Sequence, residues 1–241
     1  MFSGLLSSPA ADNIGPYDSN RRVLRERLER VEERIAKAAA SAGRRRDEIL
    51  LLAVTKKFGP ETMREAYEAG LRDFGENYVQ EWETKAPQLR DLAGARFHLI
   101  GHLQSNKARR AAELFDAIET VDAPKLAERL DQAGKMLDVM IEVKLSEEDA
   151  KSGAEASELP ALIESIRQRP NLRLTGLMTM PPWTEDAEQS RPYFERLRKL
   201  AEQHGLKGLS MGMSHDLEVA IAEGATIVRV GTALFGPRRK A

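Results

Sequence analysis

The stretch Leu50-Leu51-Leu52-Ala53-Val54-Thr55-Lys56-Lys57 is a continuous aliphatic run that ends in two lysines. Such a run is typical of a strand that is buried on both faces, as in a parallel sheet. Proteins of the α/β class place their chemistry at the carboxyl ends of such strands. A partly desolvated lysine there can act as a nucleophile toward carbonyl compounds. The alternative is that both lysines are solvated and merely close the strand.

The composition excludes several classes of protein. The 241 residues include 37 basic and 38 acidic side chains, and the formal net charge of -1 argues against attraction to nucleic acid or anionic membrane. Without cysteine there is no disulfide, thiol nucleophile or thiolate metal site. No apolar run reaches the roughly 20 residues of a membrane span. Because residues 1–20 also lack the features of a signal peptide, we expect a cytoplasmic protein.

Residues 1–20 are rich in Ser, Gly, Pro and Ala and are expected to form a flexible extension. An amphipathic helix is predicted from Arg21 to Ala42, and Gly43 ends it. Its apolar stripe consists of Leu24, Leu28, Val31 and Ile35. Since Glu is interleaved with Arg along this helix, its charges indicate a solvated face rather than a nucleic-acid site.

The rest of the chain alternates between strand and helix patterns, which indicates βαβ units and a parallel sheet. About eight units at this length favour an α/β fold of the (β/α)8 TIM-barrel type, a single domain over residues 21–241 that includes the extra N-terminal helix. An open doubly wound sheet is the alternative. After Leu50–Lys57, strands are predicted within Leu71–Tyr78 and Arg96–His102, and at Ala117–Val121, Val139–Val143, Leu172–Met178, Leu209–Met213 and Ala225–Val230.

In a barrel, the polar residues at the ends of successive strands gather on one rim. Arg229 lies in an apolar run between Val228 and Val230, and an unpaired buried guanidinium costs several kcal/mol. It therefore needs a ligand or a carboxylate partner such as Glu142. The rim residues are Lys56, Glu76, Asn77, His98, His102, Thr120, Lys144, Met178, Ser214, Arg229 and Gly231.

Two glycine turns near the end of the chain form a candidate phosphate site. Ser210-Met211-Gly212-Met213-Ser214 precedes a predicted helix, and Gly231-Thr232 follows the last strand. Backbone amides at a helix N-terminus, together with hydroxyl groups, can bind phosphate. Barrels often use the loops after their seventh and eighth strands in this way. Glycine turns are common, however, so these turns alone do not establish a phosphate site.

The histidines do not indicate a metal site. His98 and His102 are four residues apart but lie across a strand end and a glycine, so the ligand spacing of a helix does not apply. Each is expected to be a hydrogen-bonded core or rim residue. No Ser-His-Asp triad can be derived from spacing, because triads are assembled in space.

A strand-end lysine, a phosphate site and a buried arginine together fit one ligand, pyridoxal 5'-phosphate (PLP). PLP carries an aldehyde for the lysine, a phosphate for the glycine turns and a ring nitrogen for Arg229. The residues alone do not choose between Lys56 and Lys57, which point to opposite faces of a strand buried on both.

The chain closely resembles the pyridoxal phosphate homeostasis protein family, whose fold is similar to the barrel domain of alanine racemase. The resemblance runs from about Glu48 to Gly236, and its long central motif and methionine-glycine turn are specific. The matching segments are Leu51–Lys56, Phe74–Glu81, Phe97–Lys107, Lys151–Gly153, Gly176–Met178, Leu209–Ser214 and Val228–Thr232.

The resemblance implies that Lys56 is the lysine that holds the cofactor as an aldimine (Schiff base), and that Arg229 faces the ring nitrogen. It assigns no catalytic residue and no metal ligand. The remaining cofactor-binding residues that it implies are Asn77 near the cofactor and Ser214, Gly231 and Thr232 around the phosphate.

The sequence departs from the family at two positions near the rim. Lys144 stands where asparagine is usual, and His215 where an acidic residue is common. Because of these two departures, the resemblance defines the surroundings of the ring and phosphate less closely than it defines the cofactor-binding residues. Lys151 is either a second amine that handles the cofactor or a solvated loop residue.

The resemblance implies a carrier and regulator in intracellular PLP homeostasis, without turnover. An arginine at the ring nitrogen disfavours its protonation and weakens the electron sink that most carbanion chemistry on PLP needs. The alternatives are a PLP-dependent amino-acid racemase, for whose second domain we expect no room after the eighth strand, and a phosphate-binding barrel without a Schiff base. We expect a monomer, with PLP-dependent apo-enzymes as candidate recipients of the cofactor.

Overall fold

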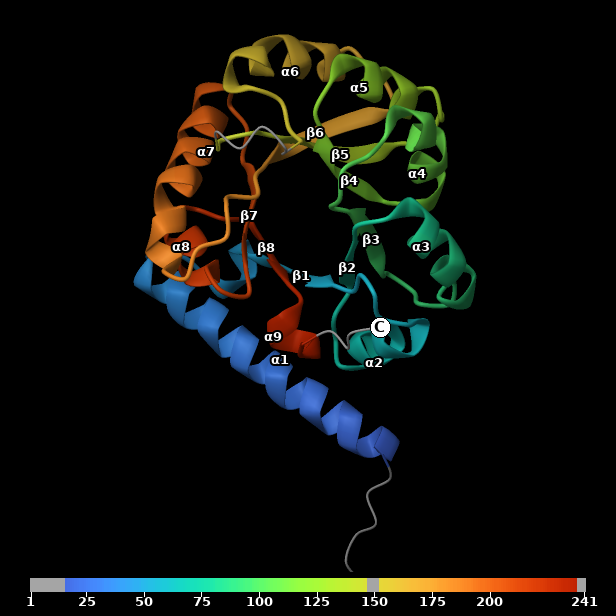
Figure 1. The fold of residues 1–241 in the computed structure, drawn as a ribbon, viewed down its shortest axis with the longest axis vertical. Coiled ribbons are helices and arrows are strands. Elements are labelled where there is room, and N and C mark those ends of the chain that lie inside the picture. The colour runs from blue at the N-terminus through green and yellow to red at the C-terminus, as the bar shows by residue number, and fades with distance from the viewer. Residues whose placement is uncertain (1–15, 147–151, 238–241) are drawn as a thin grey trace, which may run out of the picture.

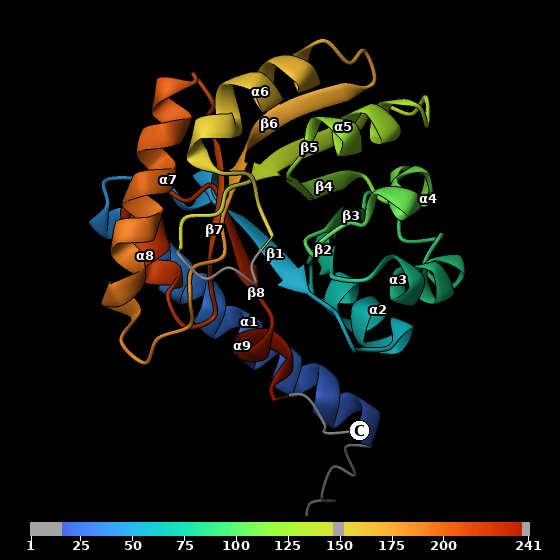
Figure 2. The ribbon, with the colours of Figure 1, turned by 45° about the horizontal axis from the view of Figure 1, so that its top comes forward.

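The computed structural model describes residues 16–146 and 152–237. Within them, eight parallel strands close into a barrel in the order β1-β2-β3-β4-β5-β6-β7-β8, and the helices form a ring around it (Figure 1). The helices between strands return the chain to the amino end of the next strand, so consecutive strands lie side by side (Figure 2). The predicted (β/α)8 barrel is confirmed, and the open sheet is excluded.

The strands coincide with the predicted aliphatic runs, apart from shifts at their ends. β7 ends at Met213 as predicted, so most of the Ser210–Ser214 segment, which is also predicted as a glycine turn, is strand. The strands are β1 (Leu50–Val54), β2 (Asp73–Glu76), β3 (Arg96–Leu99), β4 (Ala117–Val121), β5 (Leu137–Glu142), β6 (Leu172–Met178), β7 (Gly208–Met213) and β8 (Ile227–Val230).

The outer helices are α1 (Pro16–Ser41), α2 (Pro60–Glu68), α3 (Val79–Lys85), α4 (Ala108–Leu114), α5 (Pro124–Asp131), α6 (Leu159–Arg167), α7 (Arg191–Gln203), α8 (Leu217–Ala222) and α9 (Thr232–Phe235). Proline lies in the first turn of α2, α5, α6 and α7, and glycine follows the last turn of α2, α5 and α7. Short 3₁₀ turns lie at Arg46–Glu48, Ala86–Gln88, Ser105–Lys107, Ala156–Glu158 and Ala187–Ser190. Asp122 and Pro124 of the sequence predict a helix start capped by Asp122, but Ala123 occupies the cap position of α5 and no side chain caps it.

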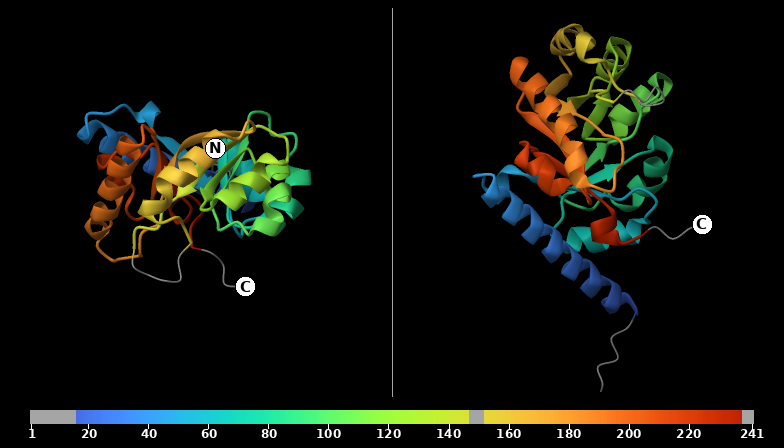
Figure 3. Two further views of the ribbon diagram at one scale, coloured as in Figure 1. Left: turned by 90° about the horizontal axis from the view of Figure 1, so that it is seen from above. Right: turned by 60° about the vertical axis from the view of Figure 1, so that its left-hand side comes forward.

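The N-terminal helix completes the outer layer. α9, which follows β8, is only four residues long, and α1 packs beside α8 and α9 along the outside of the barrel (Figure 3). Its predicted stripe is largely confirmed: Leu24, Val31 and Ile35 are buried, and Leu28 is partly buried. α1 begins at Pro16 rather than Arg21. Of the predicted extension, residues 1–15 lie outside the described residues.

The two faces of the sheet differ in chemistry. Outward-facing side chains join the helices in one large apolar cluster, to which Leu51 and Ala53 of β1 belong. Leu52 and Val54 belong instead to a small separate cluster with Ile100, inside the barrel. Alternation along the strand accounts for this division. Much of the interior surface is therefore left to polar side chains.

No helix in the described ranges is long and apolar enough to cross a membrane.

Candidate functional site

The predicted cofactor residues lie at the ends of four strands that are neighbours in the barrel. Lys56 follows β1, Asn77 follows β2, Ser214 follows β7 and Gly231 follows β8. β8 pairs with both β7 and β1, and β1 pairs with β2, so the four loops are adjacent on the carboxyl-end rim. Residues more than 150 positions apart in sequence are thus brought to one side of the barrel mouth.

Ser214 and the Gly231–Thr232 turn meet directly. The backbone N–H of Ala233 donates a hydrogen bond to Ser214 Oγ at 3.2 Å. Arg34 of α1 donates to the backbone oxygen of Ser214 at 3.0 Å and pairs with Glu218, which holds the turn from outside. Ser214 and Gly231 are partly exposed and Thr232 is exposed, so this turn is accessible to a ligand.

The preceding glycine has a structural role. Gly212 has a φ of +89°, and an added Cβ would lie 2.4 Å from the Cβ of Ala220. Only glycine adopts this backbone readily and lets α8 approach so closely. Gly212 therefore packs the end of β7 against α8.

Asn77 carries an unsatisfied polar atom. Its Oδ1 is buried and has no hydrogen-bond partner within the described part of the chain. A Cβ on Gly101 would lie 2.2 Å from the backbone oxygen of Asn77, so the β3 loop approaches Asn77 as only glycine permits. An orphaned buried acceptor costs about 1–3 kcal/mol, and a donor on a ligand would satisfy it.

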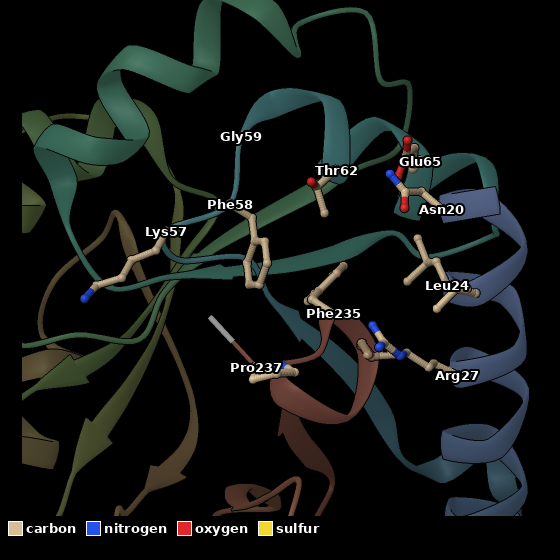
Figure 4. A pocket seen from close by; sticks show the side chains of 12 residues that line it. Asn20, Leu24, Arg27, Lys57, Phe58, Gly59, Thr62, Glu65, Phe235 and Pro237 are labelled. Carbon is tan, nitrogen blue, oxygen red and sulfur yellow. The ribbon is translucent and has the colours of Figure 1, made fainter. Parts of the chain in front are cut away.

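The two lysines after β1 differ in conformation. Lys56 is partly buried, whereas Lys57 is exposed and has a φ of +67°. In Figure 4 the Lys57 side chain extends away from Phe58 and Phe235, which line a pocket of about 420 Å³ between α1, α2 and α9. β1 ends at Val54 and both lysines lie in the turn after it, so alternation along the strand does not by itself assign either lysine to the barrel mouth.

A buried ionic cluster outside the barrel holds the main chain on both sides of Lys56. Lys85 Nζ donates to the backbone oxygen of Thr55 at 3.1 Å and to Glu76 Oε1 at 3.0 Å. Glu81 Oε1 lies 2.5 Å from Lys85 Nζ and accepts the backbone N–H of Lys57 at 2.5 Å. We call Thr55, Glu76, Glu81 and Lys85 the outer cluster.

Glu76 is the fully buried carboxylate of this cluster. Burial raises its pKa, while Lys85 and the hydroxyl of Thr55 oppose the shift. Its strand-end position predicts a rim group, but the side chain lies on the helix side of β2. Glu76 therefore supports the rim from outside.

Arg229 lies inside the barrel and is hydrogen-bonded within the protein. Nη1 donates to Ser210 Oγ at 2.7 Å, and Nη2 donates to the backbone oxygen of Thr179 at 2.8 Å. Burial lowers the pKa of Arg229, and the charges of Glu119, Asp216 and Glu142 oppose that shift. The ion pair with Glu142, the alternative to a ligand, is not formed, and Glu142 accepts a hydrogen bond from Ser152 Oγ.

His98 belongs to the barrel interior rather than to the rim. Its Nδ1 lies 2.9 Å from Glu119 Oε1 and its Nε2 lies 3.2 Å from Asp73 Oδ1. It is a hydrogen-bonded core histidine, as the sequence suggests. His102 is exposed, 3.7 Å from Asp122. In residues 16–146 and 152–237 no group of three or more acidic or histidine side chains is arranged to hold a metal ion.

The two family departures lie on the periphery. Lys144 pairs with Glu155 at 3.6 Å. His215 is exposed beside Trp183, with ring centroids 6.2 Å apart. Lys151 lies outside the described residues.

Sequence reasoning missed the residues that support Lys56 and Arg229. Lys85 holds the backbone beside Lys56, and Ser210 and Glu119 hold the side chain of Arg229. Each is a polar residue within an apolar or helical pattern, and that is the signal that could have found them. Ser210 faces the barrel interior from β7, as Arg229 does from β8, because the neighbours of each in sequence face outward. Which inward residues meet, however, depends on the barrel's register.

Comparison with known proteins agrees with this architecture. A family model described as "Alanine racemase, N-terminal domain" matches residues 27–239. The pyridoxal phosphate homeostasis protein of Pseudomonas aeruginosa is 49% identical over 219 residues, which are 88% of this chain and 95% of that protein. The Escherichia coli K12 protein of the same name is 43% identical over 226 residues, again 88% and 95% of the two chains.

Solved structures extend the likeness. PipY of Synechococcus elongatus with PLP bound has a TM-score of 0.77 and 38% identity, covering 88% of this chain and 100% of that chain. Alanine racemase of Corynebacterium glutamicum has a TM-score of 0.65 at 18% identity and covers 90% of this chain and 60% of that chain, a likeness of fold alone. The chain therefore belongs to the pyridoxal phosphate homeostasis protein family, which has the barrel of the alanine racemase N-terminal domain.

Proposed function

We propose that the chain binds PLP at the carboxyl-end rim and serves in PLP homeostasis as a carrier of the cofactor. The observation that carries the proposal is the convergence of Lys56, Asn77 and the Ser214 and Gly231–Thr232 turns from four adjacent strands. The names of relatives at 43–49% identity and the PLP-bound PipY structure support it.

The residues present fit this cofactor. Asn77 Oδ1 is an unpartnered acceptor in the site, and the turn joined by the Ala233–Ser214 hydrogen bond offers hydroxyl groups for a phosphate. PLP supplies an electrophilic aldehyde carbon when bound. Lys56 would provide the amine that bonds to it covalently. Ser214, Gly231 and Thr232 would hold the phosphate.

Arg229 sets the character of the site. A guanidinium is a donor only and stays charged, so it would donate to the ring nitrogen and disfavour protonation there. That property suits a protein that holds the cofactor and releases it better than one that stabilises carbanions. We propose a carrier without turnover, a monomer that works in the cytoplasm and has PLP-dependent apo-enzymes as recipients.

The lysine assignment is tested by reducing the mixture of protein and PLP with borohydride and locating the adduct by peptide mass. Wild type and Lys57→Ala are expected to carry the adduct on Lys56, and Lys56→Ala is expected to lose it. An adduct that persists at the same level in Lys56→Ala would contradict the assignment.

Two further measurements separate the alternatives. Ser214→Ala is expected to weaken binding of PLP but not of pyridoxal, which lacks the phosphate. A barrel that binds only the phosphate would give no adduct in any variant. Exchange of the α-proton of amino acids in deuterated water at catalytic rates would establish a racemase-like enzyme in place of a carrier.

A further inference from the structure

A continuous hydrogen-bonded chain crosses the barrel interior and ends on Arg229. It begins at Asp73 on β2 and passes through His98 on β3 to Glu119 on β4. Glu119 Oε2 accepts the hydroxyl of Ser210 on β7 at 2.5 Å, and Ser210 Oγ accepts Arg229 Nη1 at 2.7 Å. We call these five residues the inner chain. All of them except Asp73 are at most 4% exposed.

The charges along the inner chain set the direction of its hydrogen bonds. Burial by itself would lower the pKa of His98, but Asp73 and Glu119 outweigh it and raise that pKa to about 9. Burial would raise the pKa of Glu119, but His98, Arg229 and Ser210 hold it below its ordinary value. At neutral pH an imidazolium therefore donates to an ionised carboxylate.

An ionised Glu119 can only accept hydrogen bonds. The hydroxyl proton of Ser210 must therefore point toward Glu119, which leaves a lone pair of Ser210 for Arg229. A neutral amide at position 119 could donate to Ser210 instead and turn the hydroxyl toward Arg229. The carboxylate thus fixes the Ser210 hydroxyl as a donor to Glu119 and keeps its oxygen an acceptor for Arg229.

We propose that Glu119, oriented by His98 and acting through Ser210, is a positioning residue that holds the Arg229 guanidinium in the orientation needed to meet the ring nitrogen of bound PLP. The role rests on the proposed function, which it deepens. Nothing in the family resemblance assigns Glu119, His98 or Ser210 to the site.

Two other buried carboxylates near Arg229 provide a contrast. Glu142 and Asp216 also affect its charge state, but Glu142 accepts from Ser152 and Asp216 accepts from the backbone N–H of Met213. Among the described residues, hydrogen bonds connect neither of them to Arg229. Glu142→Gln therefore replaces another buried carboxylate near Arg229 and leaves the inner chain intact, which makes it the matched control for Glu119→Gln.

The first test uses the full-length protein without cofactor. NMR of the arginine side chains measures the rotation of the Arg229 guanidinium and the hydrogen exchange of its Nη groups. Restricted rotation is expected in wild type and Glu142→Gln, and faster rotation in Glu119→Gln and Ser210→Ala. Ser210→Ala keeps the His98–Glu119 pair, so it decides the matter if Glu119→Gln does not fold. Unchanged rotation in Ser210→Ala would overturn the inference.

The second test adds PLP labelled with ¹⁵N in the ring. Glu119→Gln and Ser210→Ala are expected to shift the ring nitrogen signal and raise the Kd about three- to tenfold, the size of one lost hydrogen bond, while the Lys56 adduct still forms. If Glu119→Gln and Ser210→Ala form the adduct with the same ring nitrogen signal and the same Kd as Glu142→Gln, the role of the inner chain is overturned and the proposed function is not. No adduct in wild type would overturn the proposed function, and the cofactor-free NMR would still decide the role of the inner chain.

Discussion

The outer cluster and the inner chain are both buried and charged, but they fix different things. The outer cluster lies between the sheet and α3 and holds the backbone at Thr55 and Lys57, on either side of Lys56. The inner chain lies inside the barrel and holds the side chain of Arg229. A strand end can thus be positioned through its main chain, whereas an arginine in the middle of a strand needs its guanidinium held.

The largest effect is expected from breaking the outer cluster. Lys85→Met leaves Glu76 as an uncompensated buried carboxylate, and the free energy of unfolding should fall by about 3–5 kcal/mol at pH 7. Urea unfolding measures the loss. It should shrink toward pH 5, because Glu76, whose pKa burial already raises, can then take up a proton.

The control for this prediction is Lys199→Met. Lys199 forms an exposed pair with Glu195 at 2.6 Å, and its loss should cost less than about 0.5 kcal/mol. Similar losses in the two variants would show that the outer cluster contributes no more than a surface pair.

The inner chain is expected to make stability depend on alkaline pH. Because the folded protein raises the pKa of His98 to about 9, protonated His98 stabilises the fold fully below its ordinary value of 6.5. That contribution is lost as the pH rises through about 9 and amounts to about 3 kcal/mol. Unfolding of wild type measured from pH 6 to pH 10 should show the decline.

His98→Gln should flatten the decline between those pH values. His102→Gln removes an exposed histidine and should keep it, since the contacts of His98 remain. A decline of the same size in wild type and His98→Gln would place its origin outside the inner chain.

The smallest change in the free energy of unfolding is expected at Lys57, whose backbone the outer cluster holds. Lys57→Gly should change the free energy of unfolding by less than about 1 kcal/mol, because relief of the left-handed backbone at φ +67° is offset by glycine's freedom in the unfolded chain. Lys57→Val, a β-branched residue in the same conformation, should cost about 1–2 kcal/mol or more. Equal stabilities of the two variants would show that the backbone conformation at Lys57 is not constrained.

Much of the fold follows from local pattern. Aliphatic runs such as Leu50–Val54 place the strands, and Pro60 and Gly70 bound a helix, because burial and backbone geometry act on neighbouring residues. Strand ends are less certain: β5 begins at Leu137 rather than at the predicted Val139, because Leu137 pairs with Leu172 of β6. Within the site, alternation marks Arg229 as a buried charge, and only family resemblance separates Lys56 from Lys57.

By itself the sequence determined the number and order of βα units, and so which strand ends share a rim. Only the tertiary structure decided that Arg229 is held through Ser210 and Glu119 rather than by Glu142. Ser210 and Glu119 are 91 residues apart and meet across the barrel interior. A period of two tells which side chains face inward, but which of them touch depends on how the closed barrel is staggered, including the register shifts between β4 and β5, β5 and β6, and β7 and β8.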